Sequence, residues 1–310
     1  MVLAVALTLL LGRYPRPGLL SPRLLVEDPI AAALFWQTRL PRIVLAAIGG
    51  AGLAAAGSTM QRLFANPLVE PGLIGVSQGA ALGAVIALLL GAPALVVQAG
   101  ATALALLGLA TAQWVARRLR FGGWILRVLL AGLAVSALAN AAVAFIVLRA
   151  DPVNQLPDIT FWLLGSLAGT TWREAVLVAV FVVPTVAWIV VRSWRLNVLA
   201  LTDRSAFSLG ANPRTERRSM LAAAALVTSV ITASLGIVGW VGLAVPHMVR
   251  AYSGHEAARE LPRSVLAGAL FLMLCDTLAR TLLPGELPLG AFTAALGSVA
   301  FLWLLTRSAA

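Results

Sequence analysis

The chain has 310 residues, of which 60% are hydrophobic and only 11% are charged. A soluble domain carries about 25% charged residues, so these charges are too few to cover a water-facing surface of this size, and an ordinary soluble fold is excluded. The net charge of +11 comes from Arg alone, at the ends of apolar runs. This pattern indicates membrane topology rather than nucleic-acid binding.

The apolar runs are long and continuous, which predicts transmembrane helices rather than the alternating strands of a barrel. Pro and Gly clusters separate the runs. We therefore expect an all-α, polytopic membrane protein, with residues 1–310 forming a single transmembrane domain. The expected spans are residues 1–12, 40–63, 75–91, 94–117, 125–149, 173–192, 218–236, 239–252, 263–283 and 289–306.

The first of these spans is too short to cross a bilayer, at roughly 16 Å of helix. No basic residue precedes it, so it matches a signal peptide poorly. We interpret it as the outer part of a shortened first span. With the N-terminus inside, ten passes leave fifteen Arg on the inner side and eight on the outer side. The positive-inside rule then predicts that both termini are cytoplasmic.

Two segments resemble each other: GLAVSALANAAVAFIVL at Gly132–Leu148 and GAFTAALGSVAFLWLL at Gly290–Leu305. In the expected topology they run in opposite directions, as in the inverted repeats of many transporters. Chance similarity between apolar helices is the alternative.

The segment Asn66–Ala80, NPLVEPGLIGVSQGA, interrupts an apolar stretch with two prolines, three glycines and a Glu. Backbone groups freed at membrane depth must bind other protein groups or water in a cavity. The segment therefore predicts either a shaped loop near a translocation pathway or an ordinary turn between spans.

The segment Leu235–Arg250, LGIVGWVGLAVPHMVR, carries Gly236, Gly239 and Gly242 at three-residue spacing, which favours close helix contact. We expect Pro246 to break the helix. His247 has no acidic neighbours in the sequence, so a structural role is favoured over a proton relay. The single cysteine, Cys275, lies in an apolar run and excludes a cysteine-cluster metal site; no metal site is expected.

The longest inner loop, residues 193–218, contains TDRSAFSL at Thr202–Leu209. Thr202 is suited to cap a short helix, Asp203 to its positive end, and Gly210 to its termination. Phe207 and Leu209 would then be exposed. The helix would need a partner protein to cover it, unless it packs back on its own membrane domain.

Together these segments resemble the membrane subunit of the ABC importers for vitamin B12, haem and ferric siderophores, and the pattern is especially similar to the cobalamin permeases. The resemblance covers residues 36–305 approximately. Two differences stand out: the first span is short, and the turn between Arg118 and Arg127 is longer. The matching segments are LPRIVLAAIGGAGLAAAGSTMQ, NPLVEPGLIGVSQGA, LNVLALTDRSAFSLG, GIVGWVGLAVPHMVR, DTLAR and ELPLGAFTAALGS.

The resemblance implies ten helices per subunit, with the pathway between two permease subunits, as homodimer or close paralogues. It also implies two cytoplasmic ATPase subunits, a periplasmic binding protein and a location in the bacterial inner membrane. ATP and magnesium would bind the ATPase subunits, and no cofactor is expected in this chain, which lacks GxxxxGK[ST]. Nucleic acid is not an expected partner.

The resemblance further assigns site residues. Coupling to the ATPase is expected at Leu201, Thr202, Asp203, Arg204, Ser205, Ala206, Phe207, Ser208, Leu209 and Gly210. A cytoplasmic gate is expected at Asn66, Leu68, Phe121, Gly122 and Gly123, and docking of the binding protein at Arg39, Arg42 and Arg280. For these three arginines the alternative is anchoring at the headgroups, or neutralisation of Arg280 by Asp276.

An intramembrane enzyme would need paired acids, HExxH or a nucleophile with a base. We find Asp276 as the only acid well inside an expected span, with Arg280 four residues on to neutralise it. A channel would need charge rings or a filter motif, which we do not find. The expected function is therefore the permease subunit of an ATP-driven (ABC, type II) importer for an iron chelate, ferric siderophore or haem. Cobalamin is the alternative substrate.

Overall fold

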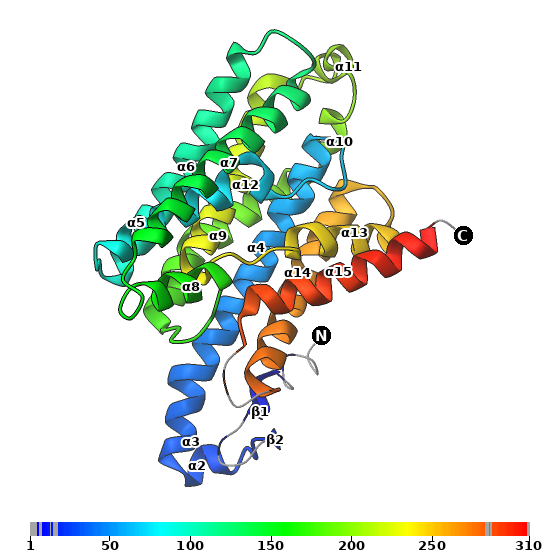
Figure 1. Ribbon diagram of the computed structural model, residues 1–310. Coiled ribbons are helices and arrows are strands. Elements are labelled where there is room, and N and C mark those ends of the chain that lie inside the picture. The colour runs from blue at the N-terminus through cyan, green and yellow to red at the C-terminus, as the bar shows by residue number, and fades with distance from the viewer. Residues whose placement is uncertain are drawn as a thin grey trace.

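The computed structural model describes residues 5, 8–12, 14, 18–282, 285 and 287–308. Two short strands near the N-terminus, β1 (Leu11–Gly12) and β2 (Gly18–Leu19), pair antiparallel, with Leu11 opposite Leu19. The rest of the described chain is helices and their connections (Figure 1). The helices are α2 (Leu24–Glu27), α3 (Pro29–Ala33), the π-helix η1 (Leu34–Arg39), α4 (Leu40–Leu63), the 3-10 helix η2 (Pro71–Ile74), α5 (Val76–Leu89), α6 (Ala94–Arg118), α7 (Trp124–Arg149), α8 (Leu156–Leu164), α9 (Trp172–Val191), α10 (Ser193–Leu199), α11 (Asp203–Ser208), α12 (Pro213–Leu235), α13 (Val241–Ser253), α14 (Ala257–Thr281) and α15 (Leu289–Ser308).

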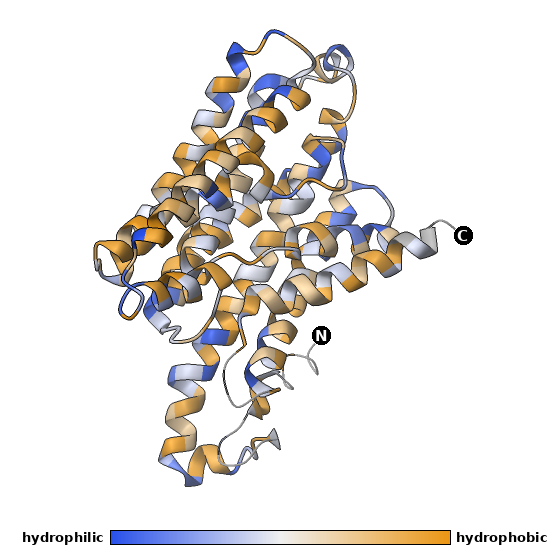
Figure 2. Cartoon of the chain, viewed as in Figure 1, coloured by the Kyte–Doolittle hydropathy of each residue, from blue (hydrophilic) through white to orange (hydrophobic). Residues whose placement is uncertain are grey.

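Among the described residues, six helical stretches are long and apolar enough to cross a membrane. They are Pro29–Leu63, Ala94–Arg118, Trp124–Arg149, Trp172–Val191, Pro213–Leu235 and Ala257–Thr281, and shorter apolar helices lie at Val76–Leu89 and Leu289–Leu304. Figure 2 shows hydrophobic residues along most of the bundle and hydrophilic residues gathered at helix ends. The all-α, polytopic membrane fold is confirmed.

Nine of the expected spans coincide with helices, although some boundaries differ. The helix expected from residue 40 starts at Pro29, because Asp28 caps it by accepting hydrogen bonds from the Ile30 and Ala31 amides, at 2.9 and 3.3 Å. The expected span at 1–12 falls largely outside the described residues; Thr8–Leu10 is helical and Leu11–Gly12 is strand. Helices α8 and α10 were not expected, since each is too short for a spanning pattern.

Helix α4 forms the centre of the bundle. In its most apolar window 78% of residues are buried, against 17% in α7, which therefore lies at the surface. Glycines permit this central position: a Cβ on Gly57 would lie 1.9 Å from the Gly242 carbonyl oxygen, and one on Gly50 would lie 2.1 Å from that of Gly268. Helices α13 and α14 thus contact α4 backbone to backbone.

The expected glycine contacts in the second broken segment are only partly correct. Gly242 packs against α4, as described, and a Cβ on Gly236 would lie 2.1 Å from the Trp162 carbonyl of α8. Gly239 has no atom within 4 Å of its Cβ position among the described residues, so it is not a packing glycine.

The order long helix, break, short helix and two further helices occurs twice, in α4–α7 and α12–α15. Each break ends in a left-handed residue that precedes the short helix: Gly75 (φ 88°) before α5 and Trp240 (φ 70°) before α13. Gly132 of α7 packs against Ile74, and Gly297 of α15 packs against Trp240. This equivalence supports the repeat but pairs Gly132 with Gly297, not with Gly290 as the sequence similarity indicated.

Candidate coupling and gating site

The short helix α11 forms as the sequence predicts. Its N-cap Thr202 accepts a hydrogen bond from the Ser205 amide at 3.3 Å, and Gly210 follows in the left-handed region at φ 77°. Ala206 is buried, whereas Phe207 and Leu209 are 72% and 63% exposed. The apolar pair therefore does not pack back onto this chain, which was the alternative to a partner-facing helix.

Arg217 of α12 holds α11 against the bundle. Its Nη1 lies 2.8 Å from an Asp203 carboxylate oxygen, and its Nη2 donates to the Leu199 carbonyl of α10 at 3.2 Å. The same guanidinium lies 5.9 Å from the centre of the Trp124 ring, at the first residue of α7. One side chain thus contacts α10, α11 and α7.

The expected gate residues lie at this same end of the molecule. Trp124 stacks on Phe64 at the end of α4, with ring centres 5.4 Å apart. The contact brings the turn between α6 and α7 next to Asn66, whose side-chain oxygen accepts from the Leu68 amide at 2.9 Å. Phe121 and Leu68 are each about half exposed, and Gly122 adopts φ 66°. The proximity expected between this turn and the Asn66 segment is present, while their gating role stays a prediction.

Because Arg217 near the start of α12 reaches the Trp124–Phe64 stack at the end of α4, the two packed helices run antiparallel (Figure 1). This agrees with the opposite orientation expected of the two repeats.

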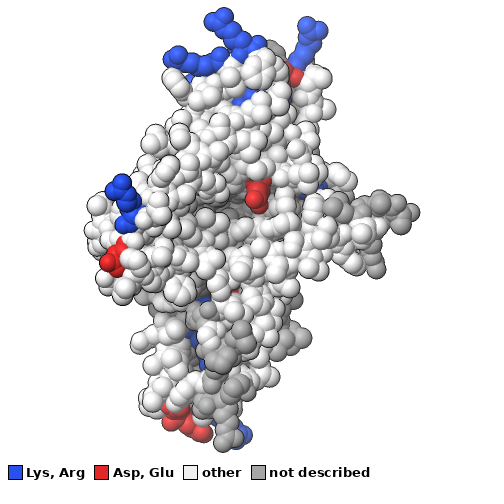
Figure 3. Space-filling view, viewed as in Figure 1, with Lys and Arg blue, Asp and Glu red and all other residues white. Residues whose placement is uncertain are grey.

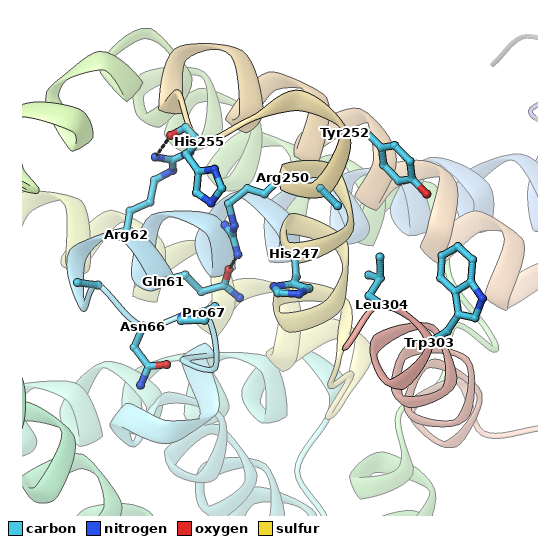
Figure 4. A pocket seen from close by; sticks show the side chains of 12 residues that line it. Gln61, Arg62, Asn66, Pro67, His247, Arg250, Tyr252, His255, Trp303 and Leu304 are labelled. Atoms are coloured by element: carbon cyan, nitrogen blue, oxygen red, sulfur yellow. Dashed lines mark hydrogen bonds between the residues drawn. The ribbon is translucent and has the colours of Figure 1, made fainter. Parts of the chain in front are cut away.

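A cavity of about 670 Å³ lies beside this segment, between the end of α4, helix α13 and the end of α15. Figure 4 shows Gln61, Arg62 and Arg250 on one side of it and Tyr252, Trp303 and Leu304 on the other, with His247 between them. The His247 ring lies 5.2 Å from that of Phe301, so it packs against α15 as well as facing the cavity.

Helix α13 passes through Pro246 without a break, contrary to expectation. Proline lacks the amide that would bond the carbonyl four residues earlier, here that of Gly242. Gln61 of α4 supplies the missing donor: its Nε2 lies 3.2 Å from the Gly242 oxygen and 3.2 Å from the Leu243 oxygen. The side-chain oxygen of Gln61 accepts from Arg250. Gln61 therefore replaces the hydrogen bond that Pro246 cannot make. Its contact with Arg250 fixes both side chains in the cavity wall.

Glu260 is a second buried acid, which the sequence does not predict. The expected span begins at residue 263, but α14 starts at Ala257 and the carboxylate is fully buried. It accepts hydrogen bonds from Ser58 at 2.7 Å, Ser264 at 2.6 Å and Arg62 at 3.0 Å, and Arg250 lies 3.7 Å away. The signal in the sequence for a polar cluster here is the pair Gln61-Arg62 at the end of an apolar run.

Of the three arginines expected on the outer side, Arg39 and Arg42 are buried and Arg280 is partly buried. Nε and Nη2 of Arg42 both donate to the Asp276 carboxylate, and the shorter contact is 2.8 Å. Arg280 Nε lies 3.8 Å from the same carboxylate. The contact expected between Asp276 and Arg280 is present, and Arg42 shares that carboxylate, while the docking role of these arginines stays a prediction. Arg39 packs against Gly12, and its Nη1 makes no hydrogen bond to any described residue.

A family model for the FecCD transport family matches residues 1–307. The chain belongs to the FecCD transport family. It is 41% identical over 280 residues to the vitamin B12 import system permease of Vibrio cholerae, covering 89% of this chain and 83% of the relative. It is 38% identical over 279 residues to the haemin transport system permease of Yersinia pestis, covering 88% and 83%.

Solved structures agree with this family. One is an inward-facing structure of an ABC transporter of the metal-chelate type. It has a TM-score of 0.91 at 31% identity, and the match covers 99% of this chain and 96% of that chain. PsaBC from Streptococcus pneumoniae, solved with a Fab, has a TM-score of 0.62 at 14% identity, covering 88% and 92%, which shows the fold alone. The identification as a membrane permease of this importer family is thus confirmed.

Proposed function

We propose that this FecCD permease forms half of the pathway of an ABC importer that is driven through α11. The observation that carries the proposal is the exposed Phe207–Leu209 pair on a capped helix that Arg217 fixes to the bundle. Exposed apolar side chains on a six-residue helix are costly unless a partner covers them. In this family the partner is a cytoplasmic ATPase subunit, which would bind the ATP and magnesium.

The assembly we propose contains two permease subunits, two ATPase subunits and a periplasmic binding protein, in the bacterial inner membrane. Both termini would be cytoplasmic, as the distribution of arginine predicts. A Ser205→Cys variant tests this, because Ser205 lies on α11 while the native Cys275 is buried. It should react only with reagents that reach the cytoplasm. Labelling by an impermeant reagent from outside would overturn the topology.

The substrate we propose is an iron chelate, either a ferric siderophore or haem. The haemin permease relative and the metal-chelate structure support this choice, and the vitamin B12 permease relative supports cobalamin as the second candidate. Uptake of ferric chelate, haemin and cobalamin by proteoliposomes of the full transporter would decide between them. Uptake of cobalamin alone would contradict the iron-chelate assignment.

Replacing Phe207 by Asp tests the coupling role. The substitution would bury an unpaired charge in the contact with the ATPase, so transport and transport-stimulated ATP hydrolysis should both fall at least tenfold. Phe207→Leu should retain most activity, because it keeps an apolar side chain. Val153→Asp is the matched control, since Val153 is 79% exposed in a turn away from α11. Unchanged transport by Phe207→Asp would show that α11 is not the coupling element.

We also propose that Arg39, Arg42 and Arg280 contribute to docking of the binding protein, once its acidic residues compete with Asp276. Arg39→Gln is the cleanest test, because Arg39 forms no ion pair among the described residues. The variant should bind the partner more weakly and with less dependence on salt, while basal ATP hydrolysis persists. If Arg39→Gln and the unmodified protein bind the partner with equal affinity at low salt, Arg39 has a structural role and does not contribute to docking.

A further inference from the structure

A basic cavity of about 430 Å³ lies where α6 ends and α7 and α12 begin, beneath α11. Its wall carries five arginines and one carboxylate: Arg117, Arg127, Arg214, Arg217, Arg218 and Asp203. Figure 3 shows basic side chains gathered at this end of the molecule, near the turn between α6 and α7.

The charges in this wall are far from balanced. Asp203 is bound by Arg217 at 2.8 Å, so the other four guanidinium groups have no carboxylate in the wall. Arg127 donates to the Leu119 carbonyl at 3.0 Å, while its buried Nε makes no hydrogen bond to a described residue. Helices α7 and α12 both begin at the cavity, and their N-termini add partial positive charge. An anion with several oxygen acceptors fits this environment.

An apolar groove of about 520 Å³ adjoins the basic cavity and shares Gln113 and Arg117 with it. The groove follows one face of α6, where Leu106, Ala110 and Trp114 recur at helical spacing. The Arg118 guanidinium lies 4.4 Å from the centre of the Trp114 ring. Tryptophan beside arginine at a helix end is typical of the headgroup level of a bilayer.

We propose that the cavity and groove together bind one anionic phospholipid of the cytoplasmic leaflet. The phosphate group occupies the basic cavity, and an acyl chain lies along the α6 groove from Trp114 towards Leu106. The inference rests on the membrane-embedded fold and not on the transported substrate. A free phosphate would explain the arginines but not the adjoining groove. An acidic protein segment would likewise leave the lipid-level groove unexplained.

The first experiment measures lipid binding to the full chain in detergent by native mass spectrometry. Phosphatidylglycerol should bind more tightly than phosphatidylcholine. Because each arginine near an anionic headgroup contributes to affinity, Arg117→Gln with Arg214→Gln should weaken phosphatidylglycerol binding on the order of tenfold or more. Both side chains are exposed and form no ion pair among the described residues, so the fold should survive.

The matched control is Arg192→Gln with Arg263→Gln, which removes the same charge from exposed positions outside the cavity. It should bind phosphatidylglycerol as the unmodified protein does. An equal loss in the control, or equal binding of the two lipids by the unmodified protein, would overturn the proposal in favour of a non-specific basic surface.

The second experiment separates lipid from free phosphate. Ala110→Trp fills the groove and should weaken phosphatidylglycerol binding, whereas Ala187→Trp, at an exposed position of α9 outside the groove, should not. Inorganic phosphate should displace phosphatidylglycerol poorly. If inorganic phosphate displaces it readily and Ala110→Trp has no effect, the cavity is a phosphate site and the lipid assignment is wrong.

Discussion

Arginines at the two ends of this bundle occupy opposite environments. At the predicted outer end, Arg42 is only 8% exposed and shares the carboxylate of Asp276 with Arg280. At the predicted cytoplasmic end, Arg117, Arg214 and Arg218 are exposed around a cavity whose single carboxylate is already bound. The buried guanidinium of Arg42 is balanced by a counterion within the fold, whereas the exposed ones remain available to a ligand. Residue type alone therefore does not distinguish a structural from a recognition arginine.

The Glu260 cluster shows that the environment of an arginine, and not the end of the bundle, decides its role, because Arg62 and Arg250 pair with a buried carboxylate at the predicted cytoplasmic end. Glu260→Ala would leave the largely buried side chains of Arg62 and Arg250 without their carboxylate. The hydroxyls of Ser58 and Ser264 would lose the acceptor to which they donate. We expect the free energy of unfolding to fall by about 3–5 kcal/mol, measured by unfolding in mixed micelles. Glu256→Ala is the control: its exposed pair with Arg259 should contribute less than about 1 kcal/mol. A loss no larger than in the control would refute the structural role of the cluster.

Local signals predicted most of the helices and the details of α11, since apolar runs, caps and turn residues act over a few positions. Thr202, Asp203 and Gly210 were assigned correctly for this reason. The long-range pairings could not be predicted, because Arg42 and Asp276 lie 234 residues apart. Pro246 was misread on the same ground: its helix continues because Gln61, on another helix, binds the carbonyl it frees.

Asp276→Asn tests the predicted outer end and should have a smaller effect than Glu260→Ala. The amide oxygen can still accept one hydrogen bond from Arg42, while the charge that balances Arg42 and Arg280 is lost. We expect the free energy of unfolding to fall by about 2–3 kcal/mol. The effect should persist at high salt, since buried pairs are weakly screened. A salt-sensitive or negligible change would mean that these arginines face water, as the docking hypothesis first assumed.

The smallest effect on stability should come from Asp203→Asn, although its effect on transport should be large. Asp203 is 65% exposed on its side chain, so its pair with Arg217 contributes less than about 1 kcal/mol to folding. The same contact nevertheless connects α11 to the side chain that also touches α10 and Trp124. Loosening it should let α11 move without moving the turn between α6 and α7. ATP hydrolysis would then continue while transport per ATP declines.

Asp158→Asn, in the first turn of α8, is a control that removes an equal charge away from α11. If Asp203→Asn keeps its transport per ATP, the connection from α11 to the turn between α6 and α7 does not run through Arg217.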